Sequence, residues 1–377
     1  MVNYPADWEA VKLKDIGHIQ MCRRIFQKQT KKSGDIPFFK ISTFGKNADS
    51  YISRELFQQY KTRYPYPEVG DILLSTAGTI GRTVIFDGKN SYFQDSNIVW
   101  LKVDKNIVNR KFLWWIYRSF PWQGLEGTTI QRLYNKIILN TEIYLPTLRE
   151  QQAIADTLST FDTYISNLTE LIEKKKAIRE GALEDLVSGK TRLEGFGGEW
   201  KKGRLLDFTK IKRGKRVVRS QLYTTHKKET FPVYQNSLEP LGYFNDYNCR
   251  RNSVFVIAAG NAGDIGFSNE NFWAADDCYS FEHTDNVSQK FLLYLLLSRQ
   301  QEISAQTRRT SIPRLSRDIL ENLLVMLPKQ NEQQAIVNTL TAMDDEIRNL
   351  ETELDKMKQI REGAMDDLLT GRIRLPL

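Results

Sequence analysis

The side chains of this sequence that could do chemistry lie just after short apolar runs. Residues 72–74 and 254–257 each lead into a glycine turn with polar side chains. Neither turn continues with the Lys-Ser/Thr pair of a phosphate-binding loop, so Gly78 and Gly260 are predicted to end strands. Arginine, lysine, threonine and asparagine can pair with phosphates and with the polar edges of bases. These side chains therefore favour binding to a polyanion.

The candidate binding residues occupy loops in two separate stretches of the chain. Each could instead be a solvated charge or a contact to phosphate alone, and for any one residue that interpretation competes with base recognition. They are Arg23, Arg24, Thr79, Arg82, Thr128, Thr129 and Arg132 in the first stretch, and Lys215, Arg216, Asn261, Arg308, Arg309, Thr310 and Arg314 in the second.

Catalytic signatures are missing from the sequence. It has no Asn/Asp-Pro-Pro-aromatic motif of amino-methyltransferases, and no Ser, His and acid residues stand in a recognisable local pattern. The carboxylates and lysine of a nuclease site have no fixed spacing, so no such cluster can be identified among the many Asp, Glu and Lys residues. The three cysteines and three histidines are scattered, which disfavours a zinc site or a disulfide framework and favours a reducing cytoplasm. We therefore expect no catalytic residue and no metal on this chain.

Two long charged segments repeat each other without a gap. The run Glu-Gln-Gln-Ala-Ile begins at Glu150 and again at Glu332, an offset of 182 residues, and the same offset relates Gly189 to Gly371. A repeat of this length, with about half its positions identical, indicates internal duplication. Each copy is predicted to be a helix that stops at its glycine in a left-handed cap.

Apolar residues inside both repeats recur at alternating steps of four and three. This heptad seam is narrow and favours one partner helix, and two copies of one unit usually pack about a pseudo-twofold axis. We expect an antiparallel coiled coil, although each helix could instead only cover its own domain. We also expect a bend or break at Gly181 and Gly363. The seam residues are Leu158, Phe161, Ile165, Leu168, Ile172, Leu340, Met343, Ile347, Leu350 and Leu354.

Charge divides along the chain in the same way. Residues 1–144 carry 21 Lys and Arg against 13 Asp and Glu, and residues 196–326 carry 19 against 14. The helical segments are acidic, with 7 against 9 in residues 145–195 and 7 against 10 in residues 327–377. All of the positive excess lies in the two globular stretches that precede the helices, which suggests that these stretches contact a polyanion.

The two basic stretches share a skeleton and are predicted to be divergent copies of one domain. Trp8 and Trp200 open them, and each continues through a basic segment, a strand after a proline, the strand with its glycine turn, and a short aromatic helix. The fold class is therefore α+β, with two globular mixed α/β domains separated by two long helices in an internal pseudo-twofold repeat. The predicted boundaries are 1–144, 145–195, 196–326 and 327–377.

This order of globule, helix, globule and helix resembles the specificity subunit of type I restriction-modification systems. The resemblance covers essentially the whole chain. It rests on the Leu-Pro then Glu-Gln-Gln-Ala-Ile entry into each helix, the Trp-x-x-Val-x-Leu opening, and the Gly-Ala-Met-Asp-Asp-Leu-Leu-Thr-Gly-Arg-Ile-Arg-Leu finish at residues 363–375. One departure is Cys22, which replaces the glycine found at Gly214 of the second copy.

The resemblance implies two target-recognition domains, each of which reads one half of a bipartite double-stranded DNA sequence, with the helices setting the gap. It also implies a non-catalytic chain that holds two adenine methyltransferase subunits and recruits endonuclease/translocase subunits. S-adenosylmethionine, ATP and magnesium would then belong to those partners. The functions implied are host defence and DNA modification.

Two other functions stay open at this level. A stand-alone DNA-binding adapter or regulator would have the same charge pattern, whereas a protein-interaction scaffold would ignore DNA and show little dependence on salt. The acidic clusters at 344–346 and 184–185 could dock partners or could be solvated helix faces. Because no signal sequence begins the chain and its apolar runs are short, we expect a soluble, cytoplasmic protein without membrane contact.

Overall fold

The computed structural model describes residues 4–122, 132–307 and 313–376, and it divides into two compact units. The first unit contains Met1–Thr169 and Glu353–Leu377, and the second contains Glu170–Thr352. Each unit therefore joins one globular part to portions of both long helices. In each unit, the helix that follows the globular part contributes its beginning and the other helix contributes its end.

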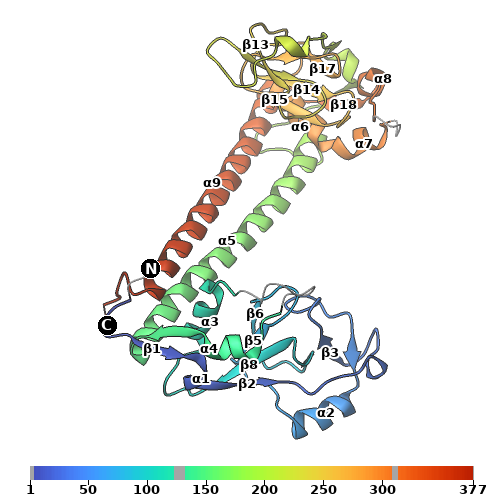
Figure 1. Cartoon of the computed structure of the whole chain (residues 1–377). Coiled ribbons are helices and arrows are strands. Elements are labelled where there is room, and N and C mark those ends of the chain that lie inside the picture. The colour runs from blue at the N-terminus through green and yellow to red at the C-terminus, as the bar shows by residue number, and fades with distance from the viewer. Residues whose placement is uncertain (1–3, 123–131, 308–312, 377) are drawn as a thin grey trace. The chain divides into compact units, whose positions relative to one another are not determined.

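The first unit is built from three small sheets. A four-stranded sheet has the order β2-β8-β5-β6, a three-stranded sheet has the order β4-β3-β7, and β1 pairs with β9 (Figure 1). All pairings are antiparallel except β3 with β7. The elements are β1 (Glu9–Lys12), α1 (Leu13–Ile16), β2 (Gly17–Met21), β3 (Ile36–Phe39), β4 (Tyr51–Ile52), α2 (Arg54–Arg63), β5 (Ile72–Ser75), β6 (Thr83–Ile85), β7 (Tyr92–Phe93), β8 (Ile98–Val103), α3 (Arg110–Ser119), α4 (Asn135–Asn140) and β9 (Glu142–Leu145).

The second unit repeats this topology. Its sheets have the orders β11-β17-β14-β15, β13-β12-β16 and β10-β18, with β12 and β16 parallel, so the prediction of two copies of one domain is confirmed. The elements are β10 (Lys201–Arg204), β11 (Ile211–Arg213), β12 (Phe231–Tyr234), β13 (Gly242–Phe244), β14 (Ser253–Ile257), β15 (Ile265–Ser268), β16 (Trp273–Ala274), β17 (Cys278–Phe281), α6 (Gln289–Ser298), α7 (Gln300–Ala305), α8 (Arg317–Glu321) and β18 (Leu324–Leu327).

The cores form where the apolar runs of the sequence lie. Every residue of β5 and of β14 is buried, as continuous apolar strands require when both faces of a sheet are covered. The aromatic helices α3 and α6 pack on these sheets through buried side chains such as Phe112, Trp115 and Phe291. Asn109 and Ser288 cap the two helices by accepting hydrogen bonds from the backbone N–H three residues on.

The long helices α5 (Leu148–Ser188) and α9 (Gln330–Leu369) are continuous. The expected break at Gly181 and Gly363 does not occur, so that part of the prediction is wrong. A helical glycine costs only about 1 kcal/mol, and packing offsets this cost: Leu183 is buried in the second core, and Met365 packs against the first. Gly189 and Gly371 follow the helices with φ of 75° and 69°, the left-handed caps that the sequence predicts.

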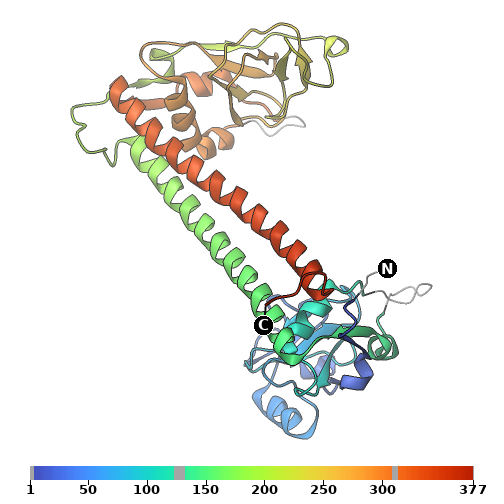
Figure 2. The same cartoon turned by 90° about the vertical axis from the view of Figure 1, so that its left-hand side faces the viewer.

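Within each unit the two helices run antiparallel. In the first unit Arg361 bonds to Asp162 at 2.9 Å, and in the second Arg179 bonds to Asp344 at 2.7 Å, a pair that the 182-residue offset maps onto the first. In both views α9 lies beside α5 within each unit (Figure 1, Figure 2). Among the predicted seam residues, Leu158, Leu168, Ile172 and Leu340 are buried, and Phe161, Ile165, Met343, Ile347, Leu350 and Leu354 are half-buried.

The start of each helix is tied to the chain that follows the end of the other. The buried Glu150 carboxylate receives two hydrogen bonds from Arg374, and the buried Glu332 receives two from Arg192, again at the 182-residue offset. Each guanidinium also lies over the indole of the opening tryptophan, Arg374 over Trp8 at 5.9 Å and Arg192 over its counterpart at 5.4 Å. These contacts close both units, the first through the C-terminal segment.

Among the described residues, no helix has both the length and the apolar composition needed to cross a bilayer.

We predict that Arg374→Met destabilises the first unit. It leaves the Glu150 carboxylate, 1% exposed, without its ionic partner, at a cost of about 1–3 kcal/mol in the free energy of unfolding. Urea unfolding and amide hydrogen exchange across residues 148–158 measure the effect. The matched control is Arg372→Met, because the partners of Arg372, Asp366 and Asp367, are more exposed. Equal effects of the two substitutions would contradict a special role for the buried carboxylate.

Candidate nucleic-acid interface

Three loops of the first unit meet at one end of its four-stranded sheet. Because Ser75 at the end of β5 pairs with Ile98 at the start of β8, the loops flanking these residues emerge side by side. The Thr76 hydroxyl donates to Ser96 O at 2.7 Å, and Leu133 N donates to Thr76 O at 2.7 Å. Residues 76–82, 94–97 and 132–133 therefore form one connected surface.

The structure brings Thr79, Arg82 and Arg132 together on this surface. Arg132 donates from Nη2 to Ser96 O at 2.8 Å, and Arg82 donates from Nη1 to Phe44 O at 2.9 Å. Thr79 is exposed at the tip of the turn. Ser96 has φ of 54°, a left-handed conformation uncommon for serine, held by the hydrogen bonds that its carbonyl accepts. Both arginines thus shape the loops, besides carrying charge.

Arg23 and Arg24 lie on the segment after β2 and join the same surface through Asp95. Arg24 donates from Nε to Asp95 at 2.8 Å, and the Arg23 guanidinium lies 5.3 Å from the centre of the Tyr64 ring. Phe26, 55% exposed, and Tyr64 line an open hollow of about 490 Å³ beside these arginines. Exposed aromatic rings next to guanidinium groups are suited to stacking on bases.

Phe26 and Tyr64 were not among the sequence candidates. An aromatic residue two positions after an Arg-Arg pair was a usable signal for Phe26, but only the fold brings Tyr64 beside it. Cys22 also lines this hollow, and burial raises the pKa of its thiol to about 12. That side chain is therefore a neutral packing group at physiological pH.

The second unit builds the same surface with different side chains. Ala258 N donates to Asp277 O at 2.6 Å, and Leu315 N donates to Ala258 O at 2.8 Å, so the loop after β14 joins the loop before β17 and residues 313–315. Asn261 is exposed at the tip of this turn, where its backbone N–H donates to Asn236 O at 2.9 Å. Arg314 pairs with Ala259 in an isolated bridge, as Arg132 does with Ala77.

Lys215 and Arg216 extend this surface along the segment after β11. Lys215 N donates to Ala274 O at 2.9 Å, and the indole of Trp273 donates to Lys215 O at 2.8 Å. A Cβ at Gly214 would lie 2.0 Å from Ala275 O, so only glycine fits this close approach. Lys215, Arg216 and Arg314 are exposed and make no ion pair with any described residue, which leaves their charges available to a ligand.

The remaining candidates, Thr128, Thr129, Arg308, Arg309 and Thr310, lie outside the described residues. Within residues 4–122, 132–307 and 313–376, no three His, Cys, Asp or Glu side chains gather in a way that could hold a metal ion. One carboxylate is bound to a neighbouring lysine: Lys212 lowers the pKa of Glu282 by hydrogen bonding, at 2.6 Å. The described arrangement offers cations, amides and hydroxyls for binding.

The family model for the type I restriction modification DNA specificity domain matches residues 5–178 and 197–359. The chain belongs to this family, and it carries the domain twice.

Similar proteins span this chain in part or in full. A Haemophilus influenzae protein named as a type I restriction enzyme specificity subunit is 54% identical over 162 residues, 43% of this chain and 42% of that protein. The type I restriction enzyme MjaVIII specificity subunit of Methanocaldococcus jannaschii is 25% identical over 98% of this chain and 94% of its own length. A crystal structure of a type I restriction-modification S subunit from M. genitalium shares the fold, with a TM-score of 0.64, 19% identity, and coverage of 98% of this chain and 97% of that one.

We predict that Arg82→Met loosens the loop surface of the first unit. It removes the hydrogen bond to Phe44 O, at a cost of about 1 kcal/mol, and should speed amide exchange in residues 40–46 and 76–82. Hydrogen exchange followed by mass spectrometry measures this. Arg23→Met is the control, since Arg23 only lies against the Tyr64 ring, and it should leave exchange in those two segments unchanged. Unchanged exchange in Arg82→Met would show that Arg82 does not order the loops.

Proposed function

We propose that this chain is the sequence-specific DNA-binding specificity subunit of a type I restriction-modification complex. Each unit reads one half of a bipartite duplex target. The observation that supports this most is that one loop surface occurs twice on one backbone frame with different side chains: Thr79 against Asn261 at the turn tips, and Arg23 against Lys215 in the basic segments. Equivalent frames with different readers suit a target whose halves differ in sequence.

Affinity and specificity come from different groups of this surface. Cations such as Lys215 and Arg216 contact phosphates and supply most of the salt-dependent affinity. Sequence is read by a few arginine, asparagine or threonine side chains that reach base edges in the major groove, each good pair contributing about 1–3 kcal/mol of discrimination. Two modules related by a pseudo-dyad match the local dyad of B-DNA.

The chemistry of the complex belongs to partner subunits in this proposal. Two methyltransferase subunits bind S-adenosylmethionine and methylate adenine, and endonuclease/translocase subunits use ATP and magnesium. The coiled coil is their scaffold. Its acidic clusters offer fewer free charges for docking partners than the sequence suggests, because some are paired within the unit. Asp344 pairs with Arg179, and Glu346 pairs with Lys175 at 2.7 Å within the second unit.

Genome-wide mapping of methylated adenine tests the function. A host that expresses this chain with its neighbouring methyltransferase gene is compared with a strain in which this chain is deleted. We expect one bipartite motif to lose methylation on deletion. Retained methylation of every motif, with purified chain that still binds DNA, would favour a stand-alone adapter, and loss of binding as well would favour a protein scaffold.

We predict that Arg314→Gln relaxes recognition in one half of the target only. Arg314 is exposed on the loop surface of the second unit, and its loss should cost about 1–3 kcal/mol at the base pair that it contacts. Arg132→Gln should affect the other half. Binding to a library randomised in each half measures both, with Arg348→Gln on α9 as the control. Equal loss in both halves would contradict modular reading.

We predict that one heptad inserted into each long helix changes the gap between half-sites. The inserts follow Thr169 in α5 and Thr352 in α9, where the division between the two units crosses both helices, so the antiparallel register is kept. Seven residues add about 10.5 Å of helix, equivalent to about three base pairs. The tolerated gap should lengthen by this amount, or assembly should fail. Methylation at the original gap would exclude the helices as its ruler.

A further inference from the structure

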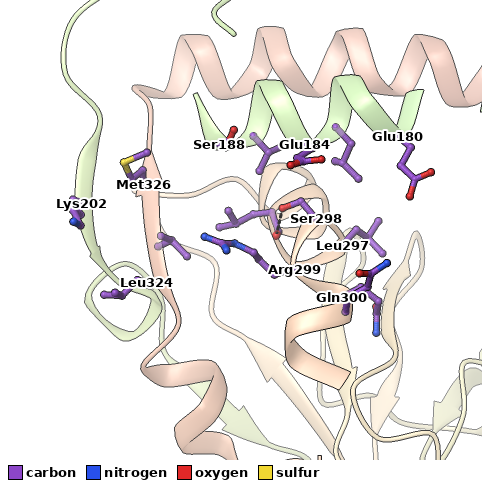
Figure 3. A pocket seen from close by; sticks show the side chains of 15 residues that line it. Glu180, Glu184, Ser188, Lys202, Leu297, Ser298, Arg299, Gln300, Leu324 and Met326 are labelled. Carbon is purple, nitrogen blue, oxygen red and sulfur yellow. Dashed lines mark hydrogen bonds between the residues drawn. The ribbon is translucent and has the colours of Figure 1, made fainter. Parts of the chain in front are cut away.

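The outer face of β18 in the second unit is apolar and exposed. Leu324 is 59% exposed and Met326 is 42% exposed, although most apolar strand residues of this unit are buried. Both side chains line a cavity of about 740 Å³, which the end of α5 also lines through residues that include Leu183 and Val187. Figure 3 shows Glu180 and Glu184 of α5 on one side of this cavity and Lys202 and Arg299 on the others.

The first unit contains the counterpart of this face. Strand β9 pairs with β1 as β18 pairs with β10: Tyr144 lies opposite Ala10, and Met326 lies opposite Lys202. The 182-residue offset that relates Tyr144 to Met326 also relates Asp366 to Glu184. The two faces can therefore be compared position by position.

An aromatic side chain covers the face in the first unit. The Tyr4 ring stacks on Tyr144, with centres 3.8 Å apart and planes 7° from parallel. Tyr4 also lies near Asp366: burial is the main cause that raises the pKa of its hydroxyl, and the charges of Tyr144 and Asp366 add to it. The first unit thus fills this place with an aromatic residue from the segment before Trp8.

The second unit has no such cover among its described residues. Counted from Trp200, the position of Tyr4 corresponds to Phe196, whose backbone N–H donates to Leu193 O at 3.2 Å in the connection from α5 to β10. Phe196 does not line the cavity.

The ion pairs at the rim of this face also differ between the two units. In the first unit Arg372 bonds to both Asp366 and Asp367. Its counterpart Lys190 bonds to Asp185 at 2.8 Å, and Glu184 makes no ion pair with a described residue. Glu180, one turn earlier on α5, likewise has no cationic partner in the described part of the chain. Two carboxylates that make no ion pair with any described residue therefore line the cavity together with Leu324 and Met326.

We propose that this cavity is a docking site for a segment of a partner protein that carries an aromatic side chain next to lysine or arginine. The aromatic ring packs on Leu324 and Met326 as Tyr4 packs on Tyr144, and thioether–aromatic contacts are favourable. The flanking cation faces Glu180 and Glu184. A buried aromatic anchor with a charged rim is the usual form of a binding hot spot. This inference stands whether or not the proposed function holds.

A peptide titration of the full chain tests the proposal. The probe is acetyl-Gly-Arg-Tyr-Arg-Gly-amide, and the readout is the NMR signal of the Met326 methyl group, assigned as the signal lost in Met326→Leu. We expect a saturable shift with Kd on the order of 1 mM, as for a single anchor residue. The peptide with alanine for tyrosine should bind at least about tenfold more weakly, a difference of about 1.4 kcal/mol. Glu180→Gln combined with Glu184→Gln should also weaken binding.

The methyl signal of Met365, which packs against the first core, is the internal control and should not move. Equal shifts with the tyrosine and alanine peptides would overturn the proposal, as would the absence of a saturable Met326 shift. Sedimentation velocity tests the other occupant, a second copy of this chain. Self-association that Met326→Lys abolishes would assign the face to a homodimer and would also overturn the proposal.

Discussion

A buried carboxylate paired with an arginine is the contact on which both units depend. Glu150 and Glu332 lie at the starts of the long helices, and each buried side chain is paired with a guanidinium from the segment that follows the other helix. Removing one partner of a buried pair is strongly destabilising. The partner charge is therefore supplied only when the end of the opposite helix is in place. The antiparallel pairing and the closure of the globular parts are one constraint, since the same arginine also covers the opening tryptophan.

The contact between the buried glutamate and the arginine is the same in both units, whereas the loop surfaces differ. The two repeats correspond residue by residue at three places: the helix starts, the buried Gln151 and Gln333, and the arginines after the glycine caps. Gln151 donates to Pro146 O at 2.9 Å and Gln333 to Pro328 O at 3.0 Å. The loop surfaces keep only their backbone connections, such as the bridges of Ala77 with Arg132 and of Ala259 with Arg314. A rigid junction allows different side chains to be presented at equivalent places.

Sequence alone predicted the architecture because its signals are local or periodic. The heptad seam, the glycine caps and the matched strand order needed no knowledge of tertiary contacts. Continuity through Gly181 could not be predicted, because neighbours such as Leu183 gain burial only in the folded unit. The residue types of the candidate site were predicted, but their contacts were not. Arg82 and Arg132 donate hydrogen bonds to loop carbonyls. Tyr64 reaches the surface from the end of α2, and no sequence motif indicated this residue. Which side chains read bases stays a prediction.

The discontinuity of the first unit affects how the chain folds as it is synthesised. The second unit is one continuous segment, Glu170–Thr352, and can close as soon as it leaves the ribosome. The first core needs Leu368 and Leu369, about 200 residues after Leu158, a delay of roughly 10–40 s at ordinary rates of translation. During that interval the apolar side of α5 is open to chaperones or to other nascent chains. The first unit is thus synthesised first, but its core is completed last.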